Sequence, residues 1–341
     1  MTDDSRPLTI LSPFDRPEEV EPLVRAGAHE LYGGVRPEGW KGSILSANQR
    51  TFSSAQVSSE GAFAESVAEA ARRGARTHLV LNAPLYDPSA YRVLMGLAER
   101  ASKWGAAGVI VGDPGLLLRL REARLPLEVT LSTLAGAMNR AAFGFLGRWG
   151  ITRAVLPRHL TLAEIGAIVE CHCEILFEAF VLIGKCPNEE GYCTFQHVSP
   201  TQRWPCEVFY ELSCVAGPPL SGAHPCSQWH ASWREADRRL GCGLCALETL
   251  RRLGVRALKL VGRGGPTAGK VANVRLVAEV LRTRLSPDQC RRAYEERFDR
   301  PCHPLTCYFP ELHPQGGAPE ARANRQGSAR SAGFNGIASR H

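Results

Sequence analysis

The sequence lacks any apolar stretch of about 18 residues, the length at which a helix can cross a bilayer. Its first residues, Met-Thr-Asp-Asp-Ser-Arg-Pro, also lack the apolar core of a secretory signal peptide. We therefore expect a cytoplasmic protein without a membrane span. Because the cytosol keeps thiols reduced, the 12 cysteines favour metal binding or catalysis over disulfides.

Three motifs of well-known hydrolases are also missing. The chain has no Gly-x-Ser-x-Gly, no His-Glu-x-x-His and no Ser-x-x-Lys in a credible context. A nucleophilic pair of Cys226 with His224 or His230 stays open. A peptidase is therefore kept as an alternative.

The chain also lacks a strong net charge, although its 22% of charged residues is ordinary for a globular protein. The net charge is +7, and residues 313–341 contribute four arginines against one glutamate within a Gly-, Ala- and Ser-rich tail that we expect to be disordered. The remaining chain is only weakly basic, which permits an RNA partner without requiring one.

What the sequence does contain is an alternation of short apolar strands with helical stretches. Eight strands, each followed by a helix or a long loop, favour an α/β (β/α)8 TIM-like barrel over a doubly wound sheet. We expect barrel strands one to seven in residues 1–184, a cysteine-rich insert or lid in 185–245, and the last strand with C-terminal helices in 246–312. The expected strands are Leu8–Leu11, Glu30–Gly34, His78–Asn82, Val109–Val111, Leu127–Leu131, Ala154–Leu156, Glu174–Val181 and Ala257–Val261.

Polar residues lie at or near the predicted carboxyl ends of these strands, where barrel enzymes place their chemistry. Among them, Glu178 and Asp113 are candidate acid/base or orienting groups. Arg158 is a candidate for binding an anionic group, because guanidinium groups suit oxyanions. A buried salt bridge between Glu178 and Arg158 is the competing interpretation. The candidate substrate-binding residues are Tyr32, Asn82, Ser132, Asn139, Lys259 and Arg263.

Cysteines gather after the seventh predicted strand. Cys186 and Cys193 are separated by six residues, Cys206 follows after twelve more, and Cys245 after another thirty-eight. Four soft thiolates suit a metal or an iron–sulfur cluster better than a catalytic dyad. Zinc is the alternative metal, since Cys242-Gly-Leu-Cys245 has the spacing of a zinc pair.

Several segments together resemble one known family. They are Leu31-Tyr32-Gly33-Gly34, Asp113-Pro114-Gly115, Ser132-Thr133, Leu156-Pro157-Arg158, Glu178-x-Phe180 with Gly184-x-Cys186 and Gly191-x-Cys193, and Leu258 to Arg263. In this order they resemble the peptidase U32 family, also called collagenase-like peptidases. The resemblance implies an iron–sulfur protein of oxygen-independent hydroxylation, acting on cytidine of tRNA or ribosomal RNA or on the ubiquinone ring. It also implies a possible second family member or redox partner.

Carried over to this chain, the resemblance makes Cys186, Cys193, Cys206 and Cys245 the ligands of a 4Fe-4S cluster. Two segments depart from the family pattern. The usual Asn-Arg-Gly-x-Cys approach to the third cysteine is replaced by Pro200 to Cys206, and Val261 stands where the family usually has a glutamate. The sequence therefore predicts a modifying enzyme for RNA or a small aromatic substrate. The alternatives are a peptidase and a non-catalytic accessory iron–sulfur subunit.

Overall fold

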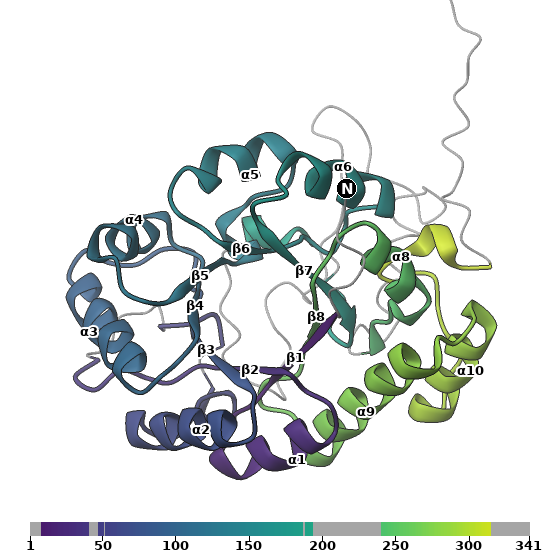
Figure 1. Cartoon of the computed structure of the whole chain (residues 1–341), viewed down its shortest axis with the longest axis horizontal. Helices are drawn as coiled ribbons and strands as arrows, with labels where there is room; N and C mark the ends of the chain where they lie inside the picture. The colour runs from purple at the N-terminus through teal and green to yellow at the C-terminus, as the bar shows by residue number, and fades with distance from the viewer. Residues whose placement is uncertain (1–7, 41–46, 51, 187, 194–239, 315–341) are drawn as a thin grey trace, which may run out of the picture.

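Eight parallel strands close into a single barrel in the computed structural model, which describes residues 8–40, 47–50, 52–186, 188–193 and 240–314 (Figure 1). Each strand pairs with the next in sequence, and β8 closes the ring against β1. The strands are β1 (Thr9–Pro13), β2 (Glu30–Gly33), β3 (Arg76–Leu81), β4 (Gly108–Val111), β5 (Glu128–Leu131), β6 (Arg153–Val155), β7 (Leu176–Leu182) and β8 (Ala257–Leu260). The (β/α)8 architecture expected from the alternation of elements is confirmed.

Helices surround the barrel on its outside (Figure 1). They are α1 (Val20–Arg25), α2 (Glu60–Arg72), α3 (Ala90–Lys103), α4 (Pro114–Ala123), α5 (Arg140–Gly147), α6 (Leu162–Cys171), α8 (Leu247–Arg252), α9 (Thr267–Thr283) and α10 (Pro287–Phe298). Local sequence fixes several helix starts. Thr161 and Glu164 form a capping box at the start of α6, and Ser286 with Gln289 forms another at α10.

Each barrel strand directs alternate side chains outward, toward the helices. Phe177 of β7, for example, packs against Phe143 of α5, with ring centroids 5.3 Å apart. No helix in the described ranges combines the length and apolar character needed to span a membrane. Most of the expected cysteine-rich insert and nearly all of the expected tail lie outside the described residues.

Charged side chains from the first residues of several strands meet inside the barrel. The guanidinium of Arg153, at the start of β6, forms ion pairs with Glu30 at 2.6 Å, Glu128 at 3.1 Å and Glu178 at 2.5 Å. Lys259 adds a 2.8 Å ion pair to Glu178. These groups come from five different strands, so the network, which we call the Arg153 network, ties the barrel together across its interior.

Because these charged groups are buried, each needs a partner of opposite charge in the folded protein. Arg153 has no exposed surface, and Glu30, Glu178 and Lys259 expose 5% or less. Burial alone raises a carboxyl pKa, but the neighbouring cations outweigh it, so the pKa values of Glu30 and Glu178 lie below the ordinary 4.5. The carboxylates therefore stay ionised in the folded protein.

Arg153→Met should lower the free energy of unfolding by about 3–5 kcal/mol, because it strands buried carboxylates without their cation. Urea denaturation measures the change. The matched control is Arg25→Met, which removes the exposed ion pair to Glu21 and should cost about 0.5 kcal/mol or less. Equal stability of the two variants would contradict a central role for Arg153.

The same network should determine how the free energy of unfolding falls at acid pH. A carboxylate whose folded pKa is depressed contributes stability that is fully present above its unfolded pKa and is lost as the pH falls toward the folded value. Wild-type stability should therefore decline below pH 4.5, the ordinary glutamate pKa. The Arg153→Met variant should show a smaller decline over that range.

Candidate active site at the barrel mouth

The carboxyl ends of the strands meet at one end of the barrel, which we call the mouth. Asn82 and Ser132 directly follow β3 and β5, and Arg158 and Arg263 each lie three residues past β6 and β8. The predicted convergence of these residues at the strand ends is confirmed. Their roles in catalysis or binding stay predictions.

Asn48 and the backbone of Gly34 hold the Arg263 side chain at the mouth. Its Nη1 donates a 2.9 Å hydrogen bond to Oδ1 of Asn48, and only 8% of the residue is exposed. A Cβ at Gly34 would stand 2.7 Å from this Nη1 and 2.6 Å from the amide nitrogen of Asn48. Glycine at position 34 is therefore a condition for seating the guanidinium.

Tyr32 is a buried residue of β2 that contacts β8 and the Lys259 ammonium. Its hydroxyl donates to the carbonyl of Leu260 at 2.7 Å, and the Lys259 ammonium lies 4.4 Å from its ring centroid. Burial raises the pKa of Tyr32, while the positive charges of Arg263, Arg50 and Arg158 oppose that rise. Three arginines therefore act on one phenol at the mouth.

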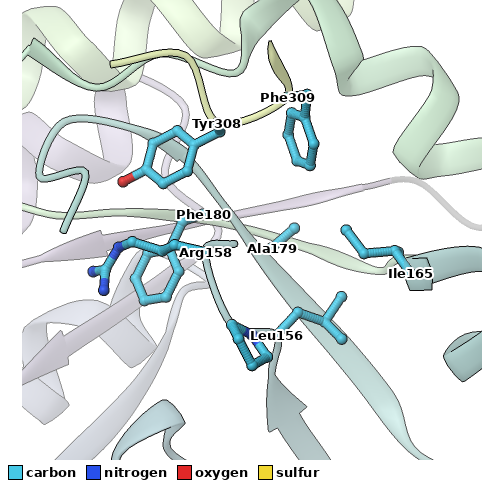
Figure 2. Close-up of a pocket in the computed structure, with 8 residues that line it drawn as sticks. Leu156, Arg158, Ile165, Ala179, Phe180, Tyr308 and Phe309 are labelled. Carbon is cyan, nitrogen blue, oxygen red and sulfur yellow. The ribbon is translucent and has the colours of Figure 1, made fainter. Parts of the chain in front are cut away.

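Arg158 joins the mouth to an aromatic recess, shown in Figure 2. Its guanidinium lies 3.6 Å from the centroid of the Phe180 ring, and Phe180 in turn stacks on Tyr308 at 6.4 Å. Glu190 forms an ion pair with the Arg158 guanidinium. The residues that line the recess are Leu156, Pro157, Arg158, Ile165, Ala179, Phe180, Tyr308 and Phe309.

Lys185 lies beside this recess. Its Nζ donates to the carbonyl of Arg158 at 2.8 Å and sits 5.2 Å from the centroid of the Tyr308 ring. Burial lowers the pKa of Lys185 to about 8 and raises the pKa of Tyr308 to about 12. Two cationic side chains, Arg158 and Lys185, therefore lie at a recess that is lined by three aromatic rings.

The loop after β7 brings its cysteines to the mouth. Cys186 and Cys193 are both partly buried, and the Cys193 sulfur accepts a 3.4 Å hydrogen bond from Nε2 of Gln49. The backbone N–H of Gln49 donates to Oδ1 of Asn82, which connects this cysteine to the end of β3. Gly191 fixes the loop position, since a Cβ there would stand 2.7 Å from Cα of Gly136.

Cys245 lies in a second group of thiols. Its thiol hydrogen-bonds to Cys290 of α10, and this contact, followed by the charge of Arg291, lowers its pKa to about 7. Cys302 and Cys307 also interact electrostatically with Cys245. Across the described ranges, no three His, Cys, Asp or Glu side chains are arranged to hold a metal ion. Cys206 lies outside the described residues, so the four-cysteine ligand set stays a prediction.

Three of the candidate site residues cap helices. Asp113 accepts from the Leu116 backbone N–H at 2.6 Å at the start of α4, and also from the Tyr91 hydroxyl and the Tyr86 backbone N–H. Ser132 caps the 3-10 helix η3 (Thr133–Ala135), and Asn139 caps α5. Each already has a structural use for its side-chain oxygen.

The prediction that Glu178 lies at the end of its strand was wrong. It is the third residue of β7, within the Arg153 network, because β7 continues for four residues beyond it. The proposed salt bridge to Arg158 is replaced by ion pairs to Arg153 and Lys259. Lys259 is likewise held by Glu178, below the mouth.

Sequence reasoning missed the other members of the Arg153 network. Glu30, Glu128 and Arg153 each open a strand, in otherwise apolar surroundings. Charged residues at equivalent first positions of strands β2, β5 and β6 were the available signal. It was overlooked because a charge beside a short strand resembles ordinary loop polarity.

Comparison with known proteins identifies the family. The sequence profile described as "Peptidase family U32" matches residues 15–308. This chain belongs to peptidase family U32. The family predicted from the sequence motifs is therefore confirmed.

Curated relatives of this U32 protein are tRNA hydroxylation proteins. It is 30% identical over 125 residues to tRNA hydroxylation protein P of Escherichia coli, covering 37% of this chain and 27% of that protein. It is 26% identical over 191 residues to tRNA hydroxylation protein P1 of Bacillus subtilis, covering 55% and 42%. The matches thus span less than half the length of these relatives.

A solved relative supports the fold of the U32 protein. The structure of the U32 peptidase Mk0906 superposes with a TM-score of 0.52 at 14% identity, covering 77% of this chain and 96% of that one. This likeness concerns the barrel and its surrounding helices alone.

Asp113→Ala should lower the free energy of unfolding by about 1–3 kcal/mol, because it removes the acceptor of three buried hydrogen bonds. Asp113→Asn keeps one side-chain oxygen as a cap and should cost less. Urea denaturation measures both, with Asn139→Ala as the exposed-cap control. A wild-type midpoint for Asp113→Ala would refute the capping role.

Proposed function

We propose that this protein takes part in the hydroxylation of tRNA, with the barrel mouth as the site that receives the nucleotide. The observation that carries the proposal is the position of Arg158 and Arg263 just past the carboxyl ends of β6 and β8, where Arg263 is hydrogen-bonded to Asn48 and Arg158 packs on the Phe180 ring. RNA is a polyanion, and guanidinium groups bind phosphate through paired N–H donors. The relatives named for tRNA hydroxylation support the same substrate class.

The guanidinium plane of Arg158 favours a nucleotide over a small anion. An unpaired RNA base binds by stacking on aromatic rings or on guanidinium planes. Phe180 and Tyr308 are buried and stack on each other, and the Arg158 guanidinium packs on the Phe180 ring, so Arg158 supplies the stacking plane at the edge of the recess (Figure 2). A tRNA substrate also fits the cytoplasmic location expected from the sequence.

The proposal is tested in an Escherichia coli strain that lacks its own tRNA hydroxylation protein P. Expression of the wild-type chain should restore hydroxylated nucleosides, measured by mass spectrometry of digested tRNA as a gain of one oxygen atom. Arg263→Gln should reduce that signal at least tenfold, because the mouth loses a buried phosphate-binding charge. Arg275→Gln, an exposed arginine on α9, is the matched control.

Three results would count against it. Absence of hydroxylated nucleosides with well-folded wild-type protein refutes the proposal for this chain acting alone. A signal restored only together with a second U32 protein would favour the accessory-subunit alternative. A wild-type signal from Arg263→Gln would remove the arginines of the mouth from the mechanism.

We also propose that Cys186, Cys193, Cys206 and Cys245 hold an iron–sulfur cluster. The fit rests on two half-buried thiols at the mouth and on the lowered pKa of Cys245, since the thiolate is the ligand form. When bound, such a cluster supplies one-electron transfer. Gln49 would orient the Cys193 sulfur through its 3.4 Å hydrogen bond.

Anaerobic purification tests the cluster directly. We expect broad absorbance near ~400 nm and about four irons per chain. Both should be lost in Cys193→Ala and retained in Cys171→Ala, which removes an exposed thiol at the end of α6. One zinc per chain would indicate a structural metal site instead, and a metal-free wild-type protein would refute the cluster.

A further inference from the structure

The outer surface of helices α4 and α5 carries an unusual excess of positive charge. Residues 114–152 contain five arginines, two glutamates and no other charged residue. One of the glutamates, Glu128, pairs with Arg153 inside the barrel, which leaves Glu122 at the surface. We call the five side chains the α4–α5 arginine surface: Arg119, Arg121, Arg124, Arg140 and Arg148.

These arginines lie on α4 and α5 or just past the ends of these helices. The two helices are neighbours around the barrel (Figure 1), and the guanidinium of Arg119 lies 4.5 Å from the centroid of the Tyr91 ring of α3. The side chain of Arg121 lies beside Gly150, just past α5, where an added Cβ would stand 3.4 Å from Cγ of the arginine. A 10-residue helix such as α4 extends the surface by about 15 Å along the barrel.

These arginines have no carboxylate partner among the described residues, unlike arginines elsewhere on the barrel. Arg72 and Arg73 pair with Glu69, Arg251 with Glu248, and Arg291 with Asp288. A cluster of unpaired like charges repels itself and raises the local concentration of a polyanion. The surface is therefore complementary to phosphates.

Exposed apolar side chains lie within the same surface. Phe145 is 48% exposed and Leu118 is 38% exposed. The guanidinium of Arg148 lies 5.4 Å from the centroid of the Phe145 ring, and Trp149 lies 5.0 Å from it. Arginine interleaved with exposed aromatic rings is the arrangement that binds RNA through phosphates and unstacked bases together.

We propose that the α4–α5 arginine surface is a second docking site for the RNA substrate, outside the barrel mouth. The inference rests on the proposed tRNA function and extends it. A tRNA reaches well beyond the single nucleotide that enters the mouth, so its body needs a contact elsewhere on the protein. The helix surface supplies that contact through charge and stacking, without reading sequence.

The test uses the full chain with Arg121, Arg124 and Arg148 all changed to Gln. The control changes Arg25, Arg72 and Arg275 to Gln, which removes the same net charge from exposed positions on α1, α2 and α9. Affinity for unmodified tRNA is measured by fluorescence anisotropy over a series of salt concentrations. Circular dichroism and thermal midpoints confirm that each variant is folded.

We expect the surface variant to bind tRNA about 10- to 100-fold more weakly than wild type near ~100 mM salt, with the slope of log affinity against log salt reduced by about 2 to 3. The control should stay within about threefold of wild type. Phe145→Ala should cost about tenfold through lost stacking while leaving the salt slope unchanged.

Equal losses in the surface variant and the control would reflect net charge alone and overturn the inference. Unchanged tRNA affinity in the surface variant would overturn it too, and would leave an acidic protein or a second copy of the chain as the occupant. Either result leaves the proposed function standing if wild type restores hydroxylated nucleosides. Failure of both assays would refute the two proposals together.

Discussion

The fold depends on a cation buried inside a ring of strands. Arg153 faces Glu30, Glu128 and Glu178 at ion-pair distances, and Arg153, Glu30 and Glu178 are buried. Such a network is costly to desolvate, and it contributes less to net stability than its short distances imply. Its physical effect is specificity, because strands β2, β5, β6 and β7 must keep one register for the charges to meet.

The network also includes two of the candidate site residues. Glu178 and Lys259 form an ion pair with each other inside the barrel, and their roles toward a ligand stay predictions. Leu11, Tyr32, Val80 and Ile110 form a small buried apolar cluster, and the Lys259 ammonium lies 4.4 Å from the centroid of the Tyr32 ring in this cluster. At the mouth, Arg158 forms an ion pair with Glu190, and Arg263 donates a hydrogen bond to Asn48. Their guanidinium groups are the cations that we propose bind the substrate.

Membership in peptidase family U32 does not by itself favour proteolysis here. The described part of the mouth offers guanidinium groups, aromatic rings and a cysteine hydrogen-bonded to an amide. On those groups we base the proposal of nucleotide recognition in preference to a nucleophilic peptidase. The proposed RNA contact extends to the arginines of α4 and α5, which lie on the side of the barrel.

The sequence by itself determined the succession of eight strands and their helices, and with it the barrel, because period and turn chemistry are local properties. It also placed Asn82, Ser132, Arg158 and Arg263 at strand ends. What a side chain does was decided only by tertiary structure. The sequence makes Glu178 a candidate acid. Its ion-pair partners, Arg153 of β6 and Lys259 of β8, lie more than twenty residues away along the chain in either direction. Ion pairing and burial depend on neighbours in space, which a linear pattern does not contain.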